Sequence, residues 1–159
     1  SKPMDSYCRN GDGDELLFVH VGTGTIETMF GVITYRPGDY INIPIGTIYR
    51  IVPAEGETTK CLVVESFSQI TSPKRYRNEY GQLLAHSPFC ERDFRGPEQL
   101  VTFEARGEFE VLTKSRGFIH KHIFNHHPFD VVGWDGYLYP WVFNIEDFEP
   151  ITGRIHQPP

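Results

Sequence analysis

Short β-prone runs separated by glycine or proline fill residues 9–53, and they limit the possible fold more than any other feature. The runs at 16–19, 25–30 and 32–35 are divided by Gly24, Gly31 and the pair Pro37-Gly38. Short strands with this punctuation are typical of antiparallel sheets. The sequence therefore predicts an all-β domain.

Later residues continue the pattern. Residues 41–43, 48–52, 109–114 and 118–124 predict further strands, and 103–107 and Arg116-Gly117 predict turns. The unbroken apolar run 61–64, within residues 60–67, predicts a buried strand. Residues 22–24 predict a hairpin. Gly11 and Gly13 can accept positive φ in the acidic turn, and the aspartates of that turn can cap backbone amides.

The segment from 68 to 100 breaks this pattern with five proline or glycine residues. A loop of this length in a compact domain is usually a functional or wrapping segment. Its basic cluster at residues 74–77 is interpreted as a solvated face, with a binding site for an acidic partner as the alternative.

The size and net charge of the chain exclude some classes of function. The 159 residues suit one domain, 1–159, and a net charge of −6 with a pI near 5.6 argues against nucleic-acid or membrane-surface partners. No apolar run approaches the length of a membrane span. Cys8, Cys61 and Cys90 are odd in number and widely spaced, which indicates free thiols in a reducing cytoplasm.

Two motifs resemble those of the cupin barrel. The Gly38-Asp39 turn, four strand residues and the PxGT string at residues 44–47 resemble the second cupin motif, and residues 14–24 resemble the tail of the first. The resemblance implies a cupin-like barrel, a jelly roll or β-sandwich, with a long wrapping loop and a few short helical turns.

The places of the cupin metal ligands hold other residues. A metal-binding cupin has His-x-His shortly before the glutamate of its first motif and another histidine after Pro-x-Gly. Here residues 8–10 and Tyr49 stand at those places, so Glu15 alone fits a ligand type. One carboxylate does not hold a metal ion. We therefore expect a cupin-like barrel without its metal centre, and no metal ligand is predicted in this chain.

Four histidines form the densest group of possible metal ligands: His120, His122, His126 and His127. Within a strand, His120 and His122 share one face, which a metal site could use. The favoured interpretation is that all four are exposed strand and turn histidines. Adventitious metal binding, or a metal-dependent cupin isomerase or oxidase built on this cluster, remains as an alternative.

A longer resemblance begins near the end of the chain. Residues 127–140 read HPFDVVGWDGYLYP and lead to FNIEDF at 143–148. This is similar to the string Ser-Pro-Phe-(Asn/Asp)-Val-Val-(Ala/Gly)-Trp-x-Gly-x-x-x-Pro, then (Tyr/Phe)-Asn-(Leu/Ile)-x-x-Phe, of homogentisate 1,2-dioxygenases. RNxDGD at residues 9–14 and RDF at 92–94 also match that family. From the residues alone, 131–132 predict a buried strand, Trp134 a packed ring and 144–148 a short helical turn.

The resemblance implies part of an Fe(II) enzyme that opens the ring of homogentisate, a small aromatic substrate, with O2 to give maleylacetoacetate. Two histidines and one glutamate hold iron in the family's C-terminal cupin domain, outside this chain, and no matching His-x(5)-Glu occurs here. The chain would comprise degenerate cupin motifs (1–70), the long loop (71–100), returning strands (101–143) and a linker (144–159) toward that catalytic domain. The family also forms trimers that pair into hexamers.

His156 lies near the place of a family histidine proposed as general base toward the substrate hydroxyl, and it is the only catalytic candidate here. Its pKa range suits that role, although a histidine in a terminal loop is the alternative. A different class of function also remains open, an autonomous metal-free cupin that binds a small molecule or a protein partner. The terminal Gln157-Pro158-Pro159 favours the fragment of a longer enzyme.

Overall fold

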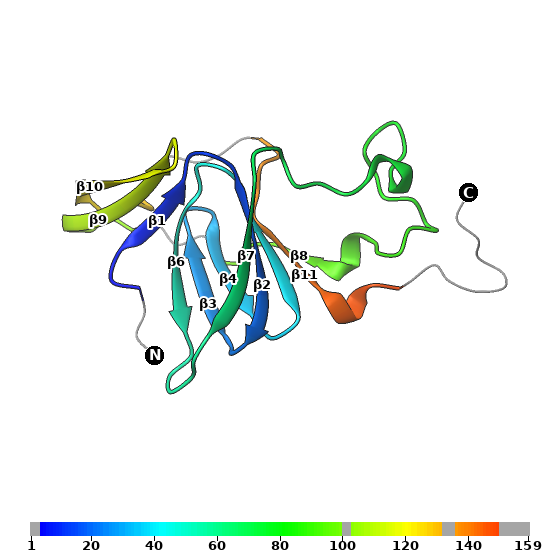
Figure 1. The fold of residues 1–159 in the computed structure, drawn as a ribbon, viewed down its shortest axis with the longest axis horizontal. Coiled ribbons are helices and arrows are strands. Elements are labelled where there is room, and N and C mark those ends of the chain that lie inside the picture. Colours follow the sequence, from blue (N-terminus) through cyan, green and yellow to red (C-terminus); the bar gives the residue numbers. More distant parts are fainter. Residues whose placement is uncertain (1–3, 100–102, 132–135, 150–159) are drawn as a thin grey trace.

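The computed structural model describes residues 4–99, 103–131 and 136–149, and in these ranges the chain is an all-β sandwich of the cupin-like kind (Figure 1). One sheet has six strands, in the order β10 (Phe118–His126), β9 (Arg106–Ser115), β1 (Tyr7–Asn10), β6 (Ile48–Pro53), β3 (Gly24–Thr28) and β4 (Gly31–Tyr35). The other has five, in the order β7 (Lys60–Ser66), β2 (Asp14–Val21), β5 (Asp39–Ile43), β11 (Trp141–Asn144) and β8 (Phe94–Arg95). The predicted fold class is confirmed.

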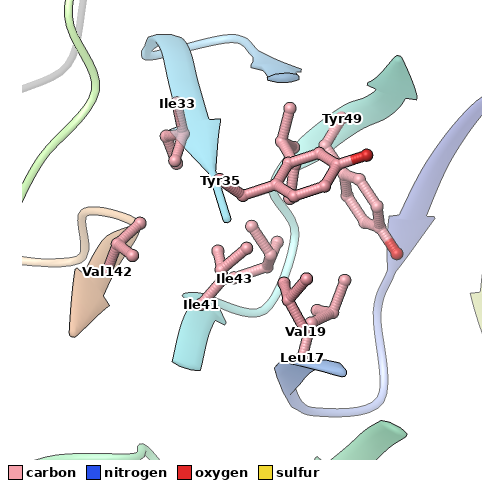
Figure 2. Packing of buried hydrophobic residues seen from close by; sticks show 9 residues of the cluster. Leu17, Val19, Ile33, Tyr35, Ile41, Ile43, Tyr49 and Val142 are labelled. Carbon is pink, nitrogen blue, oxygen red and sulfur yellow. The ribbon is translucent and has the colours of Figure 1, made fainter. Parts of the chain in front are cut away.

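The core lies between the two sheets and consists of alternate residues of their strands (Figure 2). Leu17 and Val19 of β2 point inward together with Ile41 and Ile43 of β5, because every second side chain of a strand lies on the same face. From the six-stranded sheet the cluster adds Ile26, Ile33, Tyr35 and Tyr49, and Val142 completes it from β11. A second cluster joins Tyr7, Ile48, Val111 and Phe129.

The turn before β5 is fixed by a fully buried carboxylate. Asp39 accepts hydrogen bonds from the Asn144 side chain at 2.8 Å and from the Arg95 guanidinium at 2.7 Å. Asn144 also accepts from the backbone of Glu146, which caps the 3-10 turn η3 (Ile145–Asp147). The predicted helical turn is therefore confirmed, and three strands, β5, β8 and β11, are joined by one polar network.

The acidic turn after β1 caps distant amides, as expected of its aspartates. Asp12 accepts from the backbone of Arg116 and Gly117 in the β9–β10 turn, and Asp14 accepts from the backbone of Ile45 at 2.9 Å and of Ile70 at 3.0 Å. Neither Gly11 nor Gly13 has a positive φ, so this turn does not use the conformational freedom that glycine allows.

Two further predictions about strands are wrong. Residues 22–24 are not a hairpin, because β2 and β3 belong to different sheets and the segment crosses between them. β7 is a strand but is not buried, since Leu62 is 62 % and Val63 is 54 % exposed. Among the described residues β7 ends the five-stranded sheet, and no strand of these residues covers its outer side.

The segment 127–140 also differs from expectation. Val131 is half-buried but lies outside any strand, because its N–H donates to the carbonyl of Phe129 in a tight turn. Val132 and Trp134 lie outside the described residues. The predicted turn at 103–107 is too long, since β9 begins at Arg106.

The long loop is confirmed. Between residues 68 and 99 it contains two 3-10 turns, η1 (Lys74–Tyr76) and η2 (Glu91–Asp93), and the two-residue strand β8. Figure 1 shows this segment running out from β7 to the side of the sandwich where β8 and β11 lie.

Candidate functional site

Glu15 on β2 is the residue that fits a ligand type in the motif resembling that of cupins, and both of its oxygens accept hydrogen bonds. The Tyr49 hydroxyl donates to Oε2 at 2.8 Å, and the Asn10 side-chain amide donates to Oε1 at 3.3 Å. Cys8 stands opposite Tyr49 in the pairing of β1 with β6. The residues that replace the cupin histidines therefore include the two donors that hold the carboxylate.

Electrostatics keep the neighbours of Glu15 protonated. Burial raises the pKa of the Tyr49 hydroxyl well above its usual range, and the Glu15 charge adds to this. Burial, and then the same carboxylate, also raise the pKa of the Cys8 thiol. A protonated thiol and a phenol are poor metal ligands, since thiolates are the form that binds metals.

The donor set around Glu15 does not fit the Fe(II) centre that the family resemblance implies. That centre needs two imidazoles and a carboxylate with free oxygens, whereas Glu15 has a tyrosine, an asparagine and a thiol around it. In the ranges that the structure describes, no group of three His, Cys, Asp or Glu side chains could hold a metal ion. Glu15 therefore acts here as a hydrogen-bonded structural carboxylate.

The four histidines do not form one site. His120 and His122 share a face, opposite Thr113 and Val111 of β9, and both are exposed, as expected. His126 is also exposed, and its ring nitrogen lies 3.0 Å from the Asn125 side-chain oxygen. For His127 the prediction of exposure is wrong, since only 7 % of this residue is accessible.

His127 is part of the second apolar cluster. Its ring stacks on Phe103 with centroids 4.2 Å apart, and its Nε2 lies 2.9 Å from the Tyr7 hydroxyl. The N–H of Phe129 donates to Nδ1 at 3.1 Å, so Nδ1 carries no proton and the neutral ring donates from Nε2 to Tyr7. Burial lowers the pKa of His127, and the nearby Arg50 lowers it further.

Only a weak signal in the sequence points to this role of His127. Pro128 and Phe129 follow it directly and are buried with it, whereas His120 and His122 flank the charged Lys121 on an edge strand. Because the aromatic partners Tyr7 and Phe103 are distant in sequence, only the folded chain brings them to the ring.

An aromatic cavity of about 480 Å³, which the sequence does not predict, lies between the five-stranded sheet and the long loop. Trp141, Phe143 and Tyr40 line it from the sheet, and Arg77 lines it from the loop. The basic cluster is thus solvated only in part: Lys74 and Arg75 are exposed, while Arg77 is half-buried.

A second, polar hollow of about 500 Å³ lies at the base of the β9–β10 hairpin, where Glu104, Arg106, His126 and Asp130 are among the lining residues. The catalytic candidate His156 lies outside the described residues, so its role stays a prediction. Within the described ranges, no helix has both the length and the apolar character needed to cross a membrane.

Residues 1–145 match the family described as homogentisate 1,2-dioxygenase N-terminal. A protein of Saccharolobus solfataricus that is provisionally named a dioxygenase is 42 % identical over 153 residues, which are 96 % of this chain and 39 % of the relative.

Homogentisate 1,2-dioxygenases of two bacteria are more distant. The protein of Rhodopseudomonas palustris is 28 % identical over 93 % of this chain and 32 % of its own length. That of Sinorhizobium fredii is 26 % identical over 98 % of this chain and 34 % of its own length. The chain thus spans about a third to two fifths of these relatives, and it belongs to the homogentisate 1,2-dioxygenase N-terminal family.

Proposed function

We propose that this chain is the N-terminal part of a homogentisate 1,2-dioxygenase or a close relative. The reaction would cleave the aromatic ring of homogentisate with O2 as oxidant and incorporate both oxygen atoms into maleylacetoacetate. Support comes from the family match over residues 1–145 and from relatives that bear dioxygenase names. The bound Fe(II) would supply the activation of O2, and its ligands would lie in a catalytic domain outside this chain.

Within such an enzyme this chain would serve as a scaffold. The observation that carries this part of the proposal is the state of Glu15, whose two oxygens are held by Tyr49 and Asn10. Because this carboxylate already accepts two hydrogen bonds, it stabilises the β-sandwich and does not bind a metal ion. His156 would be the one residue of this chain to act on substrate, as general base toward its hydroxyl.

The exposed edge strands suit contacts between subunits. Leu62 and Val64 of β7 and Phe118 and Ile119 of β10 are all about half or more exposed, and each strand ends its sheet. Apolar side chains along an unpaired edge favour association with another surface. We propose that a second copy of the chain covers these edges in a homo-oligomer, a trimer or hexamer in the cytoplasm.

The decisive experiment uses the longer polypeptide that contains this chain, supplied with Fe(II) and homogentisate in air. We expect the absorbance of maleylacetoacetate to rise, and its absence with a fully iron-loaded protein would contradict the proposed reaction. A second measurement is iron content. Glu15→Gln should leave the iron bound per chain unchanged, because Glu15 is not a ligand.

A folded Glu15→Gln protein that has lost its iron would overturn the scaffold role of the barrel. The variant His156→Ala tests the proposed general base. If His156 has this role, the variant should have a lower kcat and an unchanged iron content. The variant His86→Ala is the matched control, because an exposed loop histidine away from the edge strands should leave both quantities as they are.

A further inference from the structure

The aromatic cavity described above has the size of a small-molecule site, and it stands apart from the Glu15 barrel site. Ligand sites usually enclose roughly 300–1,000 Å³ and combine apolar walls with a few polar groups. This cavity, which is open to solvent, has a volume of about 480 Å³. Leu16 of β2 and Tyr40 of β5 contribute to its floor, on the face of the sheet opposite the core. Ile70 and Leu83 contribute to its cover from the long loop.

Edge-to-face ring contacts hold the aromatic walls in place. The ring of Phe94 lies 5.5 Å from that of Trp141 at an interplanar angle of 79°. Phe89 of the loop meets Phe143 at 5.7 Å and 66°, and Tyr76 meets Phe89 at 5.8 Å and 75°. Such geometry is favourable for aromatic pairs. The ring positions are therefore fixed by contacts within the protein. The rings present flat aromatic faces to a ligand.

The backbone of the cover is ordered by its own hydrogen bonds, which fix the position of Arg77. Arg77 forms an isolated β-bridge with Leu83, and its N–H donates to the carbonyl of Lys74 at 3.1 Å. The Asn78 side chain accepts from the backbone of Tyr80 and of Gln82. The backbone at Arg77 is thus part of a hydrogen-bonded turn, which limits where its guanidinium can lie.

Two buried polar atoms of this region have no partner. In the described part of the chain, Arg77 Nε and Asn42 Oδ1 are the buried side-chain polar atoms without a hydrogen bond. Asn42 is 2 % exposed and stands on β5 between Leu16 and Trp141, which both line the cavity. One atom is a donor and the other an acceptor. Unsatisfied buried groups are rare in folded proteins, and two on one covered face call for an explanation.

We propose that this cavity binds a neutral, planar aromatic molecule that carries both a hydrogen-bond acceptor and a hydrogen-bond donor. The acceptor would receive the Arg77 Nε proton. The donor would reach Asn42 Oδ1, which does not itself line the cavity but is buried on β5 between the lining residues Leu16 and Trp141. Glu91 lines the same cavity. Its charge opposes that of Arg77, so a neutral ligand fits better than an anion. The binding role is independent of the dioxygenase proposal and requires no iron.

The test titrates the full chain with 4-hydroxybenzamide, a flat neutral ring with a carbonyl acceptor and a hydroxyl donor. Binding is followed by calorimetry and by the NMR signal of the Trp141 indole N–H. We expect saturable binding with a shift of that signal, at least tenfold tighter than for p-xylene, which has the ring without polar groups. The anion 4-hydroxybenzoate should bind more weakly than the amide. Equal or tighter binding of the anion would overturn the neutral ligand class.

Arg77→Met should weaken the binding of 4-hydroxybenzamide tenfold or more and leave p-xylene unaffected. Arg75→Met is the matched control, because Arg75 lies two residues away and is exposed outside the cavity. Equal affinities for the amide in the two variants would refute the role of Arg77. Absence of binding by any of the three probes to the wild-type chain would refute the site and would indicate that another polypeptide segment fills it.

Asn42→Leu provides a readout that does not depend on Arg77. Removing an unpaired buried oxygen should leave the melting temperature of the free protein unchanged or raise it, because a buried unsatisfied group is unfavourable. The same variant should weaken binding of 4-hydroxybenzamide but not of p-xylene. A variant that melts lower and binds both probes as the wild type does would show that Asn42 is a structural residue with no contact to a ligand.

Discussion

At the scale of single residues, His127 should make the domain less stable in mild acid. A histidine in an unfolded chain titrates near pH 6.5, whereas burial lowers the pKa of His127 in the folded protein. As the pH falls below about 6.5, the unfolded state takes up a proton first, so the free energy of unfolding decreases until the folded pKa is reached. Arg50 acts in the same direction, and the charges of Glu27 and Asp130 oppose it.

The measurement is urea unfolding of the wild type and of His127→Gln from about pH 7.5 down to about pH 5, which brackets the unfolded pKa. His127→Gln should lose part of the acid-dependent decrease and cost about 1–3 kcal/mol at neutral pH, since Tyr7 and the Phe129 N–H lose their partner. His126→Gln, at an exposed position, should keep the wild-type slope. Identical slopes for all three proteins would contradict the prediction.

The hydroxyl of Tyr49 should be needed for stability. Tyr49 is 8 % exposed, and its hydroxyl donates to Glu15 at 2.8 Å. Tyr49→Phe leaves the carboxylate oxygen without this donor, so we expect a loss of about 1–3 kcal/mol in the free energy of unfolding. The double variant with Glu15→Gln should recover part of the loss, because the neutral amide needs less compensation. Additive effects of the two changes, measured in urea, would mean that the hydrogen bond has no energetic weight.

At the scale of elements, the close approach of β2 and β7 depends on a residue without a side chain. A Cβ at Gly13 would collide with the backbone carbonyl of Ser66 at the end of β7. The glycine is therefore required by the space between two strands, and its φ is not positive.

Gly13→Ala should force these strands apart and lower the free energy of unfolding by about 1–3 kcal/mol, as overpacking does. Gly96→Ala is the control, because a Cβ there meets nothing within 4 Å and its φ is not positive. It should change the stability by less than about 0.5 kcal/mol. Chemical denaturation of both variants is the measurement, and equal losses would contradict the steric argument.

At the scale of the whole molecule, the two exposed edges should control self-association. Leu62→Lys and Phe118→Lys place charges on β7 and β10, where both side chains are more than 60 % exposed. If a second copy covers these strands, each change should shift the mass measured by light scattering toward the monomer without lowering the melting temperature of the monomer. Ile45→Lys, on an exposed turn between β5 and β6, should leave the mass unchanged. An unchanged oligomer in both edge variants would contradict this contact surface.

Local sequence determined much of this protein. Glycine and proline ended the strands, so the positions of β3, β4, β9 and β10 follow from short-range propensity. The aspartates of the acidic turn cap backbone amides because a carboxylate accepts hydrogen bonds from the N–H groups that lie next to it. The Asn144 cap gave the helical turn for the same reason. The sequence also shows that histidines are missing at the places of the cupin metal ligands, because the ability to bind a metal ion depends on the type of residue.

Tertiary structure decided which strands lie in the interior and which groups meet. The apolar run of β7 predicts burial, but its position at the end of a sheet leaves Leu62 and Val63 in solvent. His127 resembles its exposed neighbours in sequence, yet Tyr7 and Phe103 enclose it. Arg77 belongs to a basic cluster, and only the folding of the long loop over the sheet buries its Nε. Burial is set by contacts between residues far apart in the chain, which local periodicity does not encode.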